Sequence, residues 1–387
     1  MATVIGTGIS TKLDSFMAGK EAALSSYYQI GRSDPSIIIT FISAIFDQEA
    51  VIKGIYSVIR DTPLVGCSSA GSISIHGSHK DSVAVFIISS NSIEFSCGIG
   101  YDISKNSRLA GSKAAKQAYS HAHNIKQAYI MLSDSLAGNN TDTLRGSQEI
   151  LGTRFPIIGG GAAYQYINNE IFTDSTAGVL VSGDIRLGIG KSIGWQPIGK
   201  PHKVTKAKLN IIKEIDKKIA VELYEEYFEK SFEEIKNEGI AKLGINYPIG
   251  IRLANKDRDY LTRVPLGIEE NGSLILNGDI REGEDISLMI GDKDLILESA
   301  RKASMEALND IKNAKIKFAL VFSDIARLLL LRKDADKEID IVKEVIGRNI
   351  PILGCYTSGE YAPFDTAELK GQCHFNNHSI SVVLFSE

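Results

Sequence analysis

The stretch PLVGCSSAG at residues 63–71 recurs twice more in the chain, as PIIGGGAAY at residues 156–164 and as PILGCYTSG at residues 351–359. Each copy begins with a proline, continues through apolar residues to a glycine, and ends in small residues. Self-similarity of this kind is typical of a chain built from repeated structural units. The first prediction is therefore a fold assembled from three copies of one unit.

The residues around each copy predict strands and helices in a common order. An apolar, β-branched run precedes each proline by one helix-length segment, and a second strand-then-helix pair lies further upstream. A further apolar run follows each copy and adds a buried strand. Units of the order β-α-β-α-β are therefore predicted over residues 4–90, 93–183 and 284–386. In the third unit the predicted first strand is Ile286–Ile290.

The segment between the second and third units has a different pattern. Lysines are frequent over residues 200–218, where interleaved acidic residues indicate a solvated face. An apolar-periodic helix is predicted over Ile219–Phe232. Asn-Gly pairs at residues 271–272 and 277–278 predict β-hairpins. This segment is expected to be a β-rich insert.

The predicted fold class is α/β, with the repeated units forming mixed sheets flanked by helices. The chain divides into two associated halves: residues 1–200 with two units, and residues 201–387 with the insert and the third unit. Parallel strands joined through helices cross over right-handedly and place ligands at their carboxyl ends. The three repeated stretches lie at such ends, so we expect them to line one pocket.

The composition excludes several classes of function. The chain has 387 residues and a formal net charge of −4, from 43 basic and 47 acidic residues, so no basic field would attract nucleic acid. Its apolar stretches are shorter than the roughly 18 residues of a membrane-spanning helix. A cytoplasmic protein is expected, because the first residues lack a secretory-signal pattern and the four cysteines lack CxxC spacing.

The repeated stretches allow two chemical interpretations. Their small residues let the backbone turn tightly and present N–H groups to a polar ligand. A nucleophile at Cys67 or Cys355 would need a base within reach, and the sequence has neither the G-x-S-x-G pattern nor a placed His–Asp pair. The nucleotide-binding glycine patterns are also missing from the sequence. Ligand binding is favoured, and a cysteine-dependent enzyme stays the alternative.

Several motifs resemble the FIST protein family, over residues 30–215 as an N-terminal region and 220–365 as a C-terminal region. The resemblance implies an intracellular sensory protein that binds small ligands such as amino acids and acts through a partner protein. Some members of the family are haem-binding nitric oxide sensors. The matching segments are GCSSAG at residues 66–71, GGGAAYQ at 159–165, GWQPIG at 194–199, GCYTSGE at 354–360 and FNNH at 375–378.

One departure from the family pattern bears on the ligand. Where the family is expected to have a cysteine after Phe-Ser, followed by an arginine, this chain has Asp324 and keeps Arg327. An arginine suits bidentate recognition of a ligand carboxylate. Asp324 and Glu360 could accept hydrogen bonds from an ammonium group. An Asp324–Arg327 ion pair without a ligand is the competing interpretation.

Two histidines beside the last strand are further candidates. His374 and His378 could line the pocket or supply an axial haem ligand, and a hydrogen-bonding role is favoured. No histidine pair has a third ligand at zinc-site spacing, so no metal site is predicted.

The sequence therefore predicts a cytoplasmic sensory protein that binds an amino acid or a similar small polar molecule, rather than an enzyme. A signalling protein is the expected partner, a homo-oligomer stays open, and no resident cofactor is predicted, with haem as the alternative. The predicted ligand-binding residues are Cys67, Ser68, Ser69, Gly71, Gly160, Gly161, Ala162, Tyr164, Asp324, Arg327, Cys355, Tyr356, Thr357, Glu360, His374 and Asn376.

Overall fold

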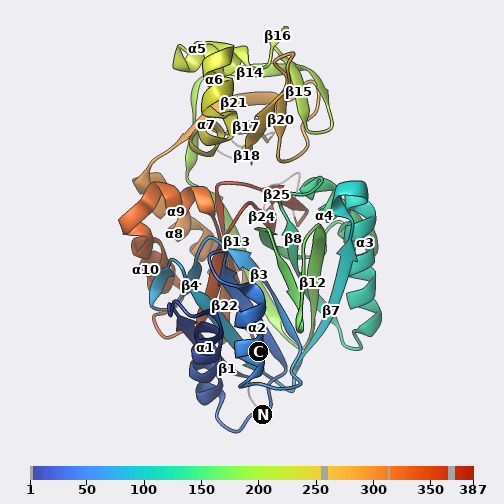
Figure 1. The fold of residues 1–387 in the computed structure, drawn as a ribbon, viewed down its shortest axis with the longest axis vertical. Helices are drawn as coiled ribbons and strands as arrows, with labels where there is room; N and C mark the ends of the chain where they lie inside the picture. Colours follow the sequence, from blue (N-terminus) through green and yellow to red (C-terminus); the bar gives the residue numbers. More distant parts are fainter. Residues whose placement is uncertain (1–2, 254–259, 313, 365–370) are drawn as a thin grey trace.

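The computed structural model describes residues 3–253, 260–312, 314–364 and 371–387. Within these residues the strands form three six-stranded mixed sheets and one eight-stranded sheet. The three six-stranded sheets carry helices on their outer faces, and the eight-stranded sheet lies beyond one end of them, at the top of Figure 1. The predicted α/β class with mixed sheets flanked by helices is confirmed.

The first two units follow the predicted order of elements. Asp14 and Asp47 cap the helices of the first unit, and Asn139 caps the second helix of the second unit, each accepting a backbone N–H from the first turn. The bounds are β1 Val4–Ser10, α1 Ser15–Ile30, β2 Ile37–Ser43, α2 Gln48–Tyr56, β3 Leu64–Ser69 and β6 Val83–Ser89, then β7 Ile93–Tyr101, α3 Ile103–His121, β8 Lys126–Asp134, α4 Asn140–Leu151, β9 Ile157–Ala162 and β12 Ser175–Gly183.

The third unit begins earlier in the chain than the sequence predicts. Its first strand is β13, Arg186–Ile193, which pairs with the last strand as β1 and β7 do in their units. The prediction of Ile286–Ile290 is wrong, because those residues belong to β21, Asp285–Gly291, in the eight-stranded sheet. Residues 195–291 are thus inserted after the first strand. The other elements are α8 Lys293–Asp310, β22 Ile316–Asp324, α9 Ile325–Leu331, η1 Arg332–Asp334, α10 Ala335–Ile346, β23 Ile352–Thr357 and β26 Ser379–Ser386.

Glycine pairs in the first strand of each unit let the first helix lie directly on the strand. A Cβ added to Gly8 of β1, Gly100 of β7 or Gly190 of β13 would lie 1.9 Å from a carbonyl oxygen of α1, α3 or α8. Each strand reads Gly-x-Gly, and the helix residue that approaches is an alanine in every case. This shared pattern identifies β13 as the third copy of the first strand.

A short hairpin follows each repeated stretch and joins the sheet of another unit. β4–β5 pairs with β23, β10–β11 pairs with β3, and β24–β25 pairs with β9. Two residues separate each hairpin from the strand before it, so most of the predicted loop residues are strand ends. The cyclic exchange joins the three units into one body. The bounds are β4 Ser72–Ser74, β5 Gly77–His79, β10 Gln165–Ile167, β11 Glu170–Phe172, β24 Glu360–Pro363 and β25 Cys373–Asn376.

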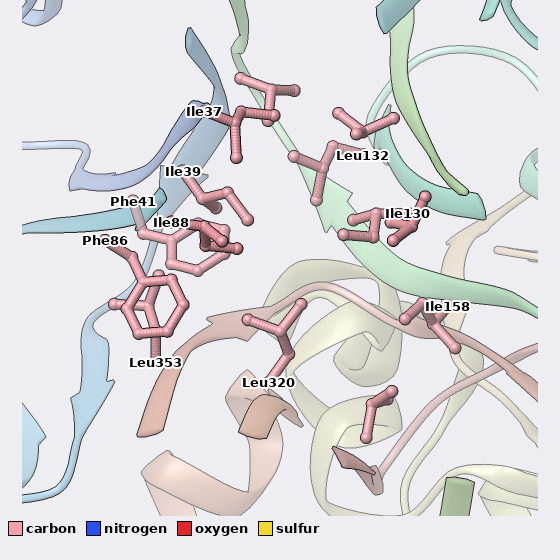
Figure 2. Close-up of a cluster of buried hydrophobic side chains, with 14 of the residues drawn as sticks. Ile37, Ile39, Phe41, Phe86, Ile88, Ile130, Leu132, Ile158, Leu320 and Leu353 are labelled. Atoms are coloured by element: carbon pink, nitrogen blue, oxygen red, sulfur yellow. The ribbon is translucent and has the colours of Figure 1, made fainter. Parts of the chain in front are cut away.

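The apolar core lies between the three sheets. Successive strand residues face opposite sides of a sheet, so every second residue of the central strands points inward. Figure 2 shows these side chains converging from strands of all three sheets. The other face of each sheet is covered by its own helices. The inward residues drawn include Ile39 and Phe41 of β2, Ile130 and Leu132 of β8, Leu320 of β22 and Leu353 of β23.

The insert forms the eight-stranded sheet and three short helices. Its ends lie side by side, because Trp195 pairs with Gly291 where the insert joins the third unit. None of the described helices has the length and hydropathy that a membrane-spanning helix requires. The bounds are β14 Trp195–Lys208, β15 Ile211–Ile215, β16 Lys218–Ile219, α5 Glu222–Phe228, α6 Phe232–Glu238, α7 Ile240–Asn246, β17 Ile249–Arg252, β18 Tyr260–Arg263, β19 Pro265–Ile268, β20 Leu274–Leu276 and β21.

Two predictions for the insert need correction. The helix predicted over Ile219–Phe232 is shorter, since α5 ends at Phe228: Glu229 adopts the left-handed conformation at φ 52°, and Ser231 then caps the start of α6 with a capping box. The hairpin predicted at residues 271–272 is present, since β19 pairs with β20. The one predicted at 277–278 is wrong, because β20 pairs with β15 and β19 rather than with β21.

Candidate functional site

The carboxyl ends of β3, β9 and β23 meet, and each is hydrogen-bonded to the other two. The three repeated stretches therefore lie together, which is the arrangement that a shared pocket requires. The bonds between them are Ser68 N to Tyr164 O (3.0 Å), Ala70 N to Tyr356 O (3.2 Å), Tyr356 N to Gly71 O (2.9 Å), Gly161 N to Gly359 O (2.9 Å) and Ser358 N to Gly161 O (2.9 Å).

Close packing accounts for the small residues of these stretches. A Cβ on Gly66, Gly159 or Gly354 would lie 2.0, 2.1 or 1.9 Å from a carbonyl oxygen of the neighbouring parallel strand. A Cβ on Gly160 or Gly161 would meet a side chain at 2.5 or 2.6 Å. These glycines are needed for contact within and between units. Their presence is therefore weak support for a backbone cradle around a ligand.

The cysteines of the stretches belong to the apolar core. Cys67 and Cys355 are fully buried among the inward residues, within hydrogen-bonding reach of each other. Burial raises the pKa of Cys355 well above its ordinary value, so its thiol is a poor nucleophile at neutral pH. Ser68 Oγ accepts the N–H groups of Ala163 and Tyr164 at 3.1 and 3.0 Å. Ser68 thus completes a turn between units.

The inner faces of the sheets become polar at the carboxyl ends of β2, β8 and β22. There the first residue of each hairpin faces a serine at the start of the last strand of its unit, either just before that strand or as its first residue. The shared backbone position carries a hydroxyl, an amide and a carboxyl group in the three units. The hydrogen bonds are Ser82 Oγ to Ser72 Oγ (3.0 Å), Ser175 Oγ to Gln165 Oε1 (2.8 Å) and Ser379 Oγ to Glu360 Oε2 (2.5 Å).

Glu360 is a fully buried carboxyl group. Thr357 Oγ1 donates to its Oε1 at 2.8 Å, and Ser379 donates to the other oxygen. Burial raises the pKa of Glu360 well above its ordinary value, and the adjacent Asp324 raises it further; the two hydroxyl groups and Arg327 lower it by less. Glu360 therefore keeps its proton to a higher pH than an ordinary carboxyl group, and in its protonated form it can donate as well as accept a hydrogen bond.

Asp324 and Arg327 do not form the ion pair that the sequence suggests. Asp324 ends β22 and caps α9, and Arg327 is fully buried in the same helix. Arg327 donates to Glu338 Oε1 through Nε at 2.9 Å and Nη2 at 2.7 Å, and also to the carbonyl groups of Ile296 and His378. The Asp324–Arg327 interpretation is wrong, because Glu338 is the partner.

The buried position of Glu338 can be recognised from the sequence. It lies in the apolar stripe of α10 with Ala335, Ile339, Val342 and Ile346, all buried. A charged residue at such a position needs a buried partner. That Arg327 binds a ligand carboxylate stays a prediction, and its guanidinium is already held by Glu338.

His378 occupies a special backbone position. Its φ of 61° lies in the left-handed region, where the equivalent residues are Asp81 and Asp174 at 45° and 48°. Nε2 lies 2.9 Å from the carbonyl oxygen of Ile245, so Nε2 carries the hydrogen and Nδ1 is an acceptor. Burial lowers the pKa of His378, which leaves the ring neutral at neutral pH. The ring of Trp195 packs against it at 4.6 Å.

Asn376 faces the same interior as Glu360, because the two residues are directly opposite on β25 and β24. Its Nδ2 donates to the carbonyl oxygen of His374 at 2.8 Å. Among the described residues, neither Oδ1 of Asn376 nor Nδ1 of His378 has a hydrogen-bond partner, and both are buried. We call these two atoms the open acceptors.

The buried polar groups of Asp324, Glu360, Asn376 and His378 form what we call the polar end of the third unit. The remaining predicted residues lie outside it. Tyr356 packs under the helices of the third unit, and Tyr164 packs against those of the first. Ala162 lies in the central core, and Ser69 is the buried last residue of β3. His374 packs against Phe364 at 5.2 Å, and burial, then nearby cations, lower its pKa to about 4.

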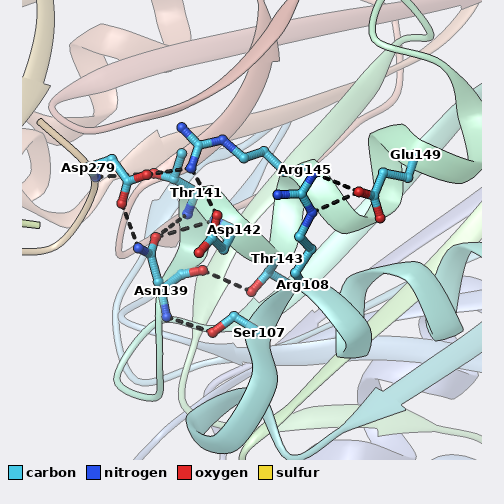
Figure 3. Close-up of polar contacts among 9 residues, drawn as sticks. All are labelled: Ser107, Arg108, Asn139, Thr141, Asp142, Thr143, Arg145, Glu149 and Asp279. Carbon is cyan, nitrogen blue, oxygen red and sulfur yellow. Dashed lines mark hydrogen bonds and ion pairs between the residues drawn. The ribbon is translucent and has the colours of Figure 1, made fainter. Parts of the chain in front are cut away.

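The insert lies over the polar ends of the second and third units. Asp279 accepts a hydrogen bond at 2.6 Å from Asn139, which caps α4, and pairs with Arg145 of the same helix, as Figure 3 shows. Thr262 and Arg263 of β18 donate to the carbonyl groups that flank Asn376. The insert also has a cavity of about 140 Å³ of its own, lined by Lys200, His202, Ile215, Asp216, Lys218, Ile219, Glu222, Leu223 and Glu226.

The family of the chain follows from two matches. The FIST N domain matches residues 36–218, and the FIST C domain matches residues 220–363. The chain belongs to the FIST family. The resemblance found in the sequence is confirmed, and the matches include all three repeated stretches. The boundary between the FIST N and FIST C domains falls within the insert, so these domains do not coincide with the three units.

Two relatives of this FIST protein are uncharacterized proteins. An uncharacterized protein of Mycobacterium tuberculosis, Rv0628c, is 22% identical over 98% of this chain and 99% of its own length. The uncharacterized protein MJ1623 of Methanocaldococcus jannaschii is 25% identical over 67% of this chain. The match spans 54% of the length of that relative.

Solved structures with some likeness are enzymes. The structure of chorismatase covers the whole of both chains with 7% identity and a TM-score of 0.37. A structure of cyanuric acid hydrolase also covers both chains, with 8% identity and a TM-score of 0.37. Values this low support no inference about activity.

The described side chains of the FIST protein are poorly placed to bind a metal ion or a haem. Within the described part of the chain, no cluster of three or more His, Cys, Asp or Glu residues is placed to hold a metal ion. A haem would need an accessible histidine beside an apolar slot. His378 is enclosed by Trp195 and Ile245, and His374 packs against Phe364. These histidines do not fit a haem.

Proposed function

We propose that this FIST protein is a cytoplasmic sensory protein that binds an amino acid or a similar small polar molecule. The ligand binds at the polar end of the third unit, beneath the insert. One observation carries the proposal: the two open acceptors have no partner among the described residues, Asn376 lies opposite the buried Glu360, and His378 lies near the buried Asp324. Buried polar groups normally have partners, because leaving them without one costs free energy. A ligand would supply those partners.

The contacts of the insert support a signalling role. The insert joins the third unit through two adjacent connections, and it contacts the polar end through His378 and the strand β25. A ligand held there contacts both parts. It would favour one orientation of the insert over others and so change the surface that a partner protein meets.

The cysteine-dependent alternative has less support. Cys67 and Cys355 are fully buried, and no base is hydrogen-bonded to either among the described residues. All four cysteines are unpaired thiols, which is the usual state in a reducing compartment and supports the cytoplasmic assignment.

Thermal unfolding of the purified chain tests the proposal. A library of amino acids, amines, organic acids, nucleotides and haem is screened for compounds that raise the unfolding temperature, since a ligand at 100 times its dissociation constant stabilises by about 2.7 kcal/mol. The expected result is a selective shift that is lost in Asn376→Ala. The control is Ser72→Ala, at the position in the first unit equivalent to Glu360. A screen without any shift, or a shift that Asn376→Ala leaves unchanged, contradicts the proposal.

A further inference from the structure

The first strand of each unit lies at the edge of its sheet. β1, β7 and β13 each pair with the last strand of their own unit, and among the described residues no strand pairs with their other side. An open edge presents backbone N–H and C=O groups that can pair with another chain. The same strands have partly buried apolar side chains against the central core: Ile5 and Ile9, Phe95 and Cys97, Leu187 and Ile189.

A side chain of the first helix bonds to each open edge. The first helix lies directly on the glycine pair of the first strand, so its side chains reach the edge beside it. In every unit the residue between the two glycines donates its backbone N–H to that side chain, at the surface of the molecule. The hydrogen bonds are Thr7 N to Gln29 Oε1 (3.2 Å), Ile99 N to Gln117 Oε1 (3.0 Å) and Ile189 N to Asp310 Oδ2 (3.3 Å).

The three side chains have equivalent positions on their helices. A Cβ added to Gly6, Gly98 or Gly188 would lie 2.0, 2.1 or 2.1 Å from the carbonyl oxygen of Ser26, Ala114 or Ala307. The bonding side chain comes three residues later in each helix, and it is exposed in each. An exposed hydrogen bond that water could replace contributes little to stability. Its recurrence in three units therefore indicates a role at the edge itself.

The contacts differ in how completely they occupy the edge. The Nε2 atom of Gln29 also donates to the carbonyl oxygen of Thr7 at 2.5 Å, so this amide bonds to both backbone groups, as a neighbouring strand would. In the third unit Glu306 accepts the N–H of Lys191 at 3.3 Å, one turn before Asp310. Carboxylates on an edge repel the carbonyl groups of an approaching strand.

We propose that Gln29, Gln117 and Asp310 block strand addition between copies of this chain. We call these three residues the edge guards. A strand that approaches β1, β7 or β13 must displace the guard before it can form its own hydrogen bonds at the centre of the edge. The partner excluded is a second copy of this chain, joined edge to edge through its first strands. The inference concerns self-association and is independent of the proposed function.

Sedimentation velocity of the full chain over a range of concentrations tests the inference. The guard variant combines Gln29→Ala, Gln117→Ala and Asp310→Ala, and its association constant is expected to rise about 10-fold or more over the parent. The control variant combines Ser25→Ala, Ser120→Ala and Glu298→Ala. These residues are exposed on the same three helices, and the net charge changes equally. No change in the guard variant, or an equal rise in the control, overturns the inference.

A second substitution locates any association at β1. Thr7→Pro removes the N–H that an added strand would need, and proline is tolerated on the open side of an edge strand. Gln29→Ala alone should raise the association constant, and Gln29→Ala with Thr7→Pro should return it to within about 2-fold of the parent. Circular dichroism checks that each variant is folded. Association that persists in the folded double variant would show that it does not use this edge and would overturn the assignment to Gln29.

Discussion

The first and third units place different chemistry on one backbone. Ser72 and Ser82 of the first unit bond to each other, and Glu360 and Ser379 occupy the equivalent positions of the third. The end of the central strand is Ser43 in the first unit and Asp324 in the third. The first unit thus carries hydroxyl groups at its polar end, whereas the third buries two carboxyl groups. Residues that the units share maintain the common fold, so functional residues are expected at positions where the units differ.

The units also differ in whether the insert contacts their polar ends. The insert contacts α4 of the second unit and the hairpin and turn of the third. The third unit therefore has buried carboxyl groups and open acceptors next to its contacts with the insert. Variants that reduce this difference are the most informative tests.

The largest effect is expected from the buried ion pair that distinguishes the third unit. Glu338→Ala leaves the Arg327 cation buried without its partner, so the free energy of unfolding should fall by roughly 3–5 kcal/mol. Urea denaturation followed by circular dichroism measures this. The control, Glu344→Ala, removes an exposed carboxylate of the same helix and should cost less than about 0.5 kcal/mol. Similar losses in the free energy of unfolding of Glu338→Ala and Glu344→Ala would contradict the expectation that the buried ion pair matters more than an exposed one.

The next effect concerns the pH dependence caused by Glu360. Its pKa is raised in the folded state, so its contribution to stability is fully present below the unfolded value near 4.5 and is lost as pH rises toward the folded pKa. The loss approaches about 1.4 kcal/mol per pH unit. Glu360→Gln removes this dependence, so the variant should gain in stability over the parent as pH rises from 5 to about 8. His378 titrates in both chains and cancels from the difference.

Urea denaturation of the parent and Glu360→Gln across this pH range gives the result directly. A stability difference that stays constant with pH would show that Glu360 is ionised in the folded state, as an ordinary carboxylate.

A smaller effect compares the equivalent serines. Ser379→Ala leaves a buried carboxyl oxygen without its donor and should cost about 1–3 kcal/mol, whereas Ser82→Ala removes hydroxyl contacts with Ser72 Oγ and the His79 carbonyl oxygen and should cost about 1 kcal/mol. Denaturation at pH 7 measures both. Equal losses of stability in Ser379→Ala and Ser82→Ala would contradict the comparison, because the two hydrogen bonds would then be alike in strength.

The smallest effect is expected at the contact between the insert and the second unit. Asp279→Ala removes the partner of Asn139 and Arg145, but Arg145 keeps Asp142, so global stability should fall by only about 0.5–1 kcal/mol. Limited proteolysis should nevertheless cut the two connections of the insert faster. Glu149→Ala, which breaks the Arg108 pair between α3 and α4, is the control and should leave this rate unchanged.

Sequence reasoning predicts the parts of the fold that are encoded locally. The order of strands and helices in the first two units follows from apolar periodicity, and the three repeated stretches do lie together. The first strand of the third unit was misplaced, because Ile286–Ile290 and β13 are both apolar runs before a helix or an insert. The Gly-x-Gly pattern shared with β1 and β7 is the signal that identifies β13.

The candidate site was less predictable. Asp324, Glu360 and Asn376 could be named from their place beside the repeated stretches, and they do lie at one polar end. The cyclic exchange of hairpins could not be inferred, because pairing between units depends on tertiary packing. For the same reason the sequence gives no sign that Ile245 of the insert would fix the tautomer of His378. Glu338, by contrast, was visible as a charge in a buried stripe.

A crystal structure of the full chain with the most stabilising compound from the screen tests the central claim most directly. The account predicts the ligand between the third unit and the insert, in contact with Asp324 and the open acceptors of His378 and Asn376. A ligand found instead in the cavity of the insert beside Lys200 and His202, with the polar end unchanged, would contradict it.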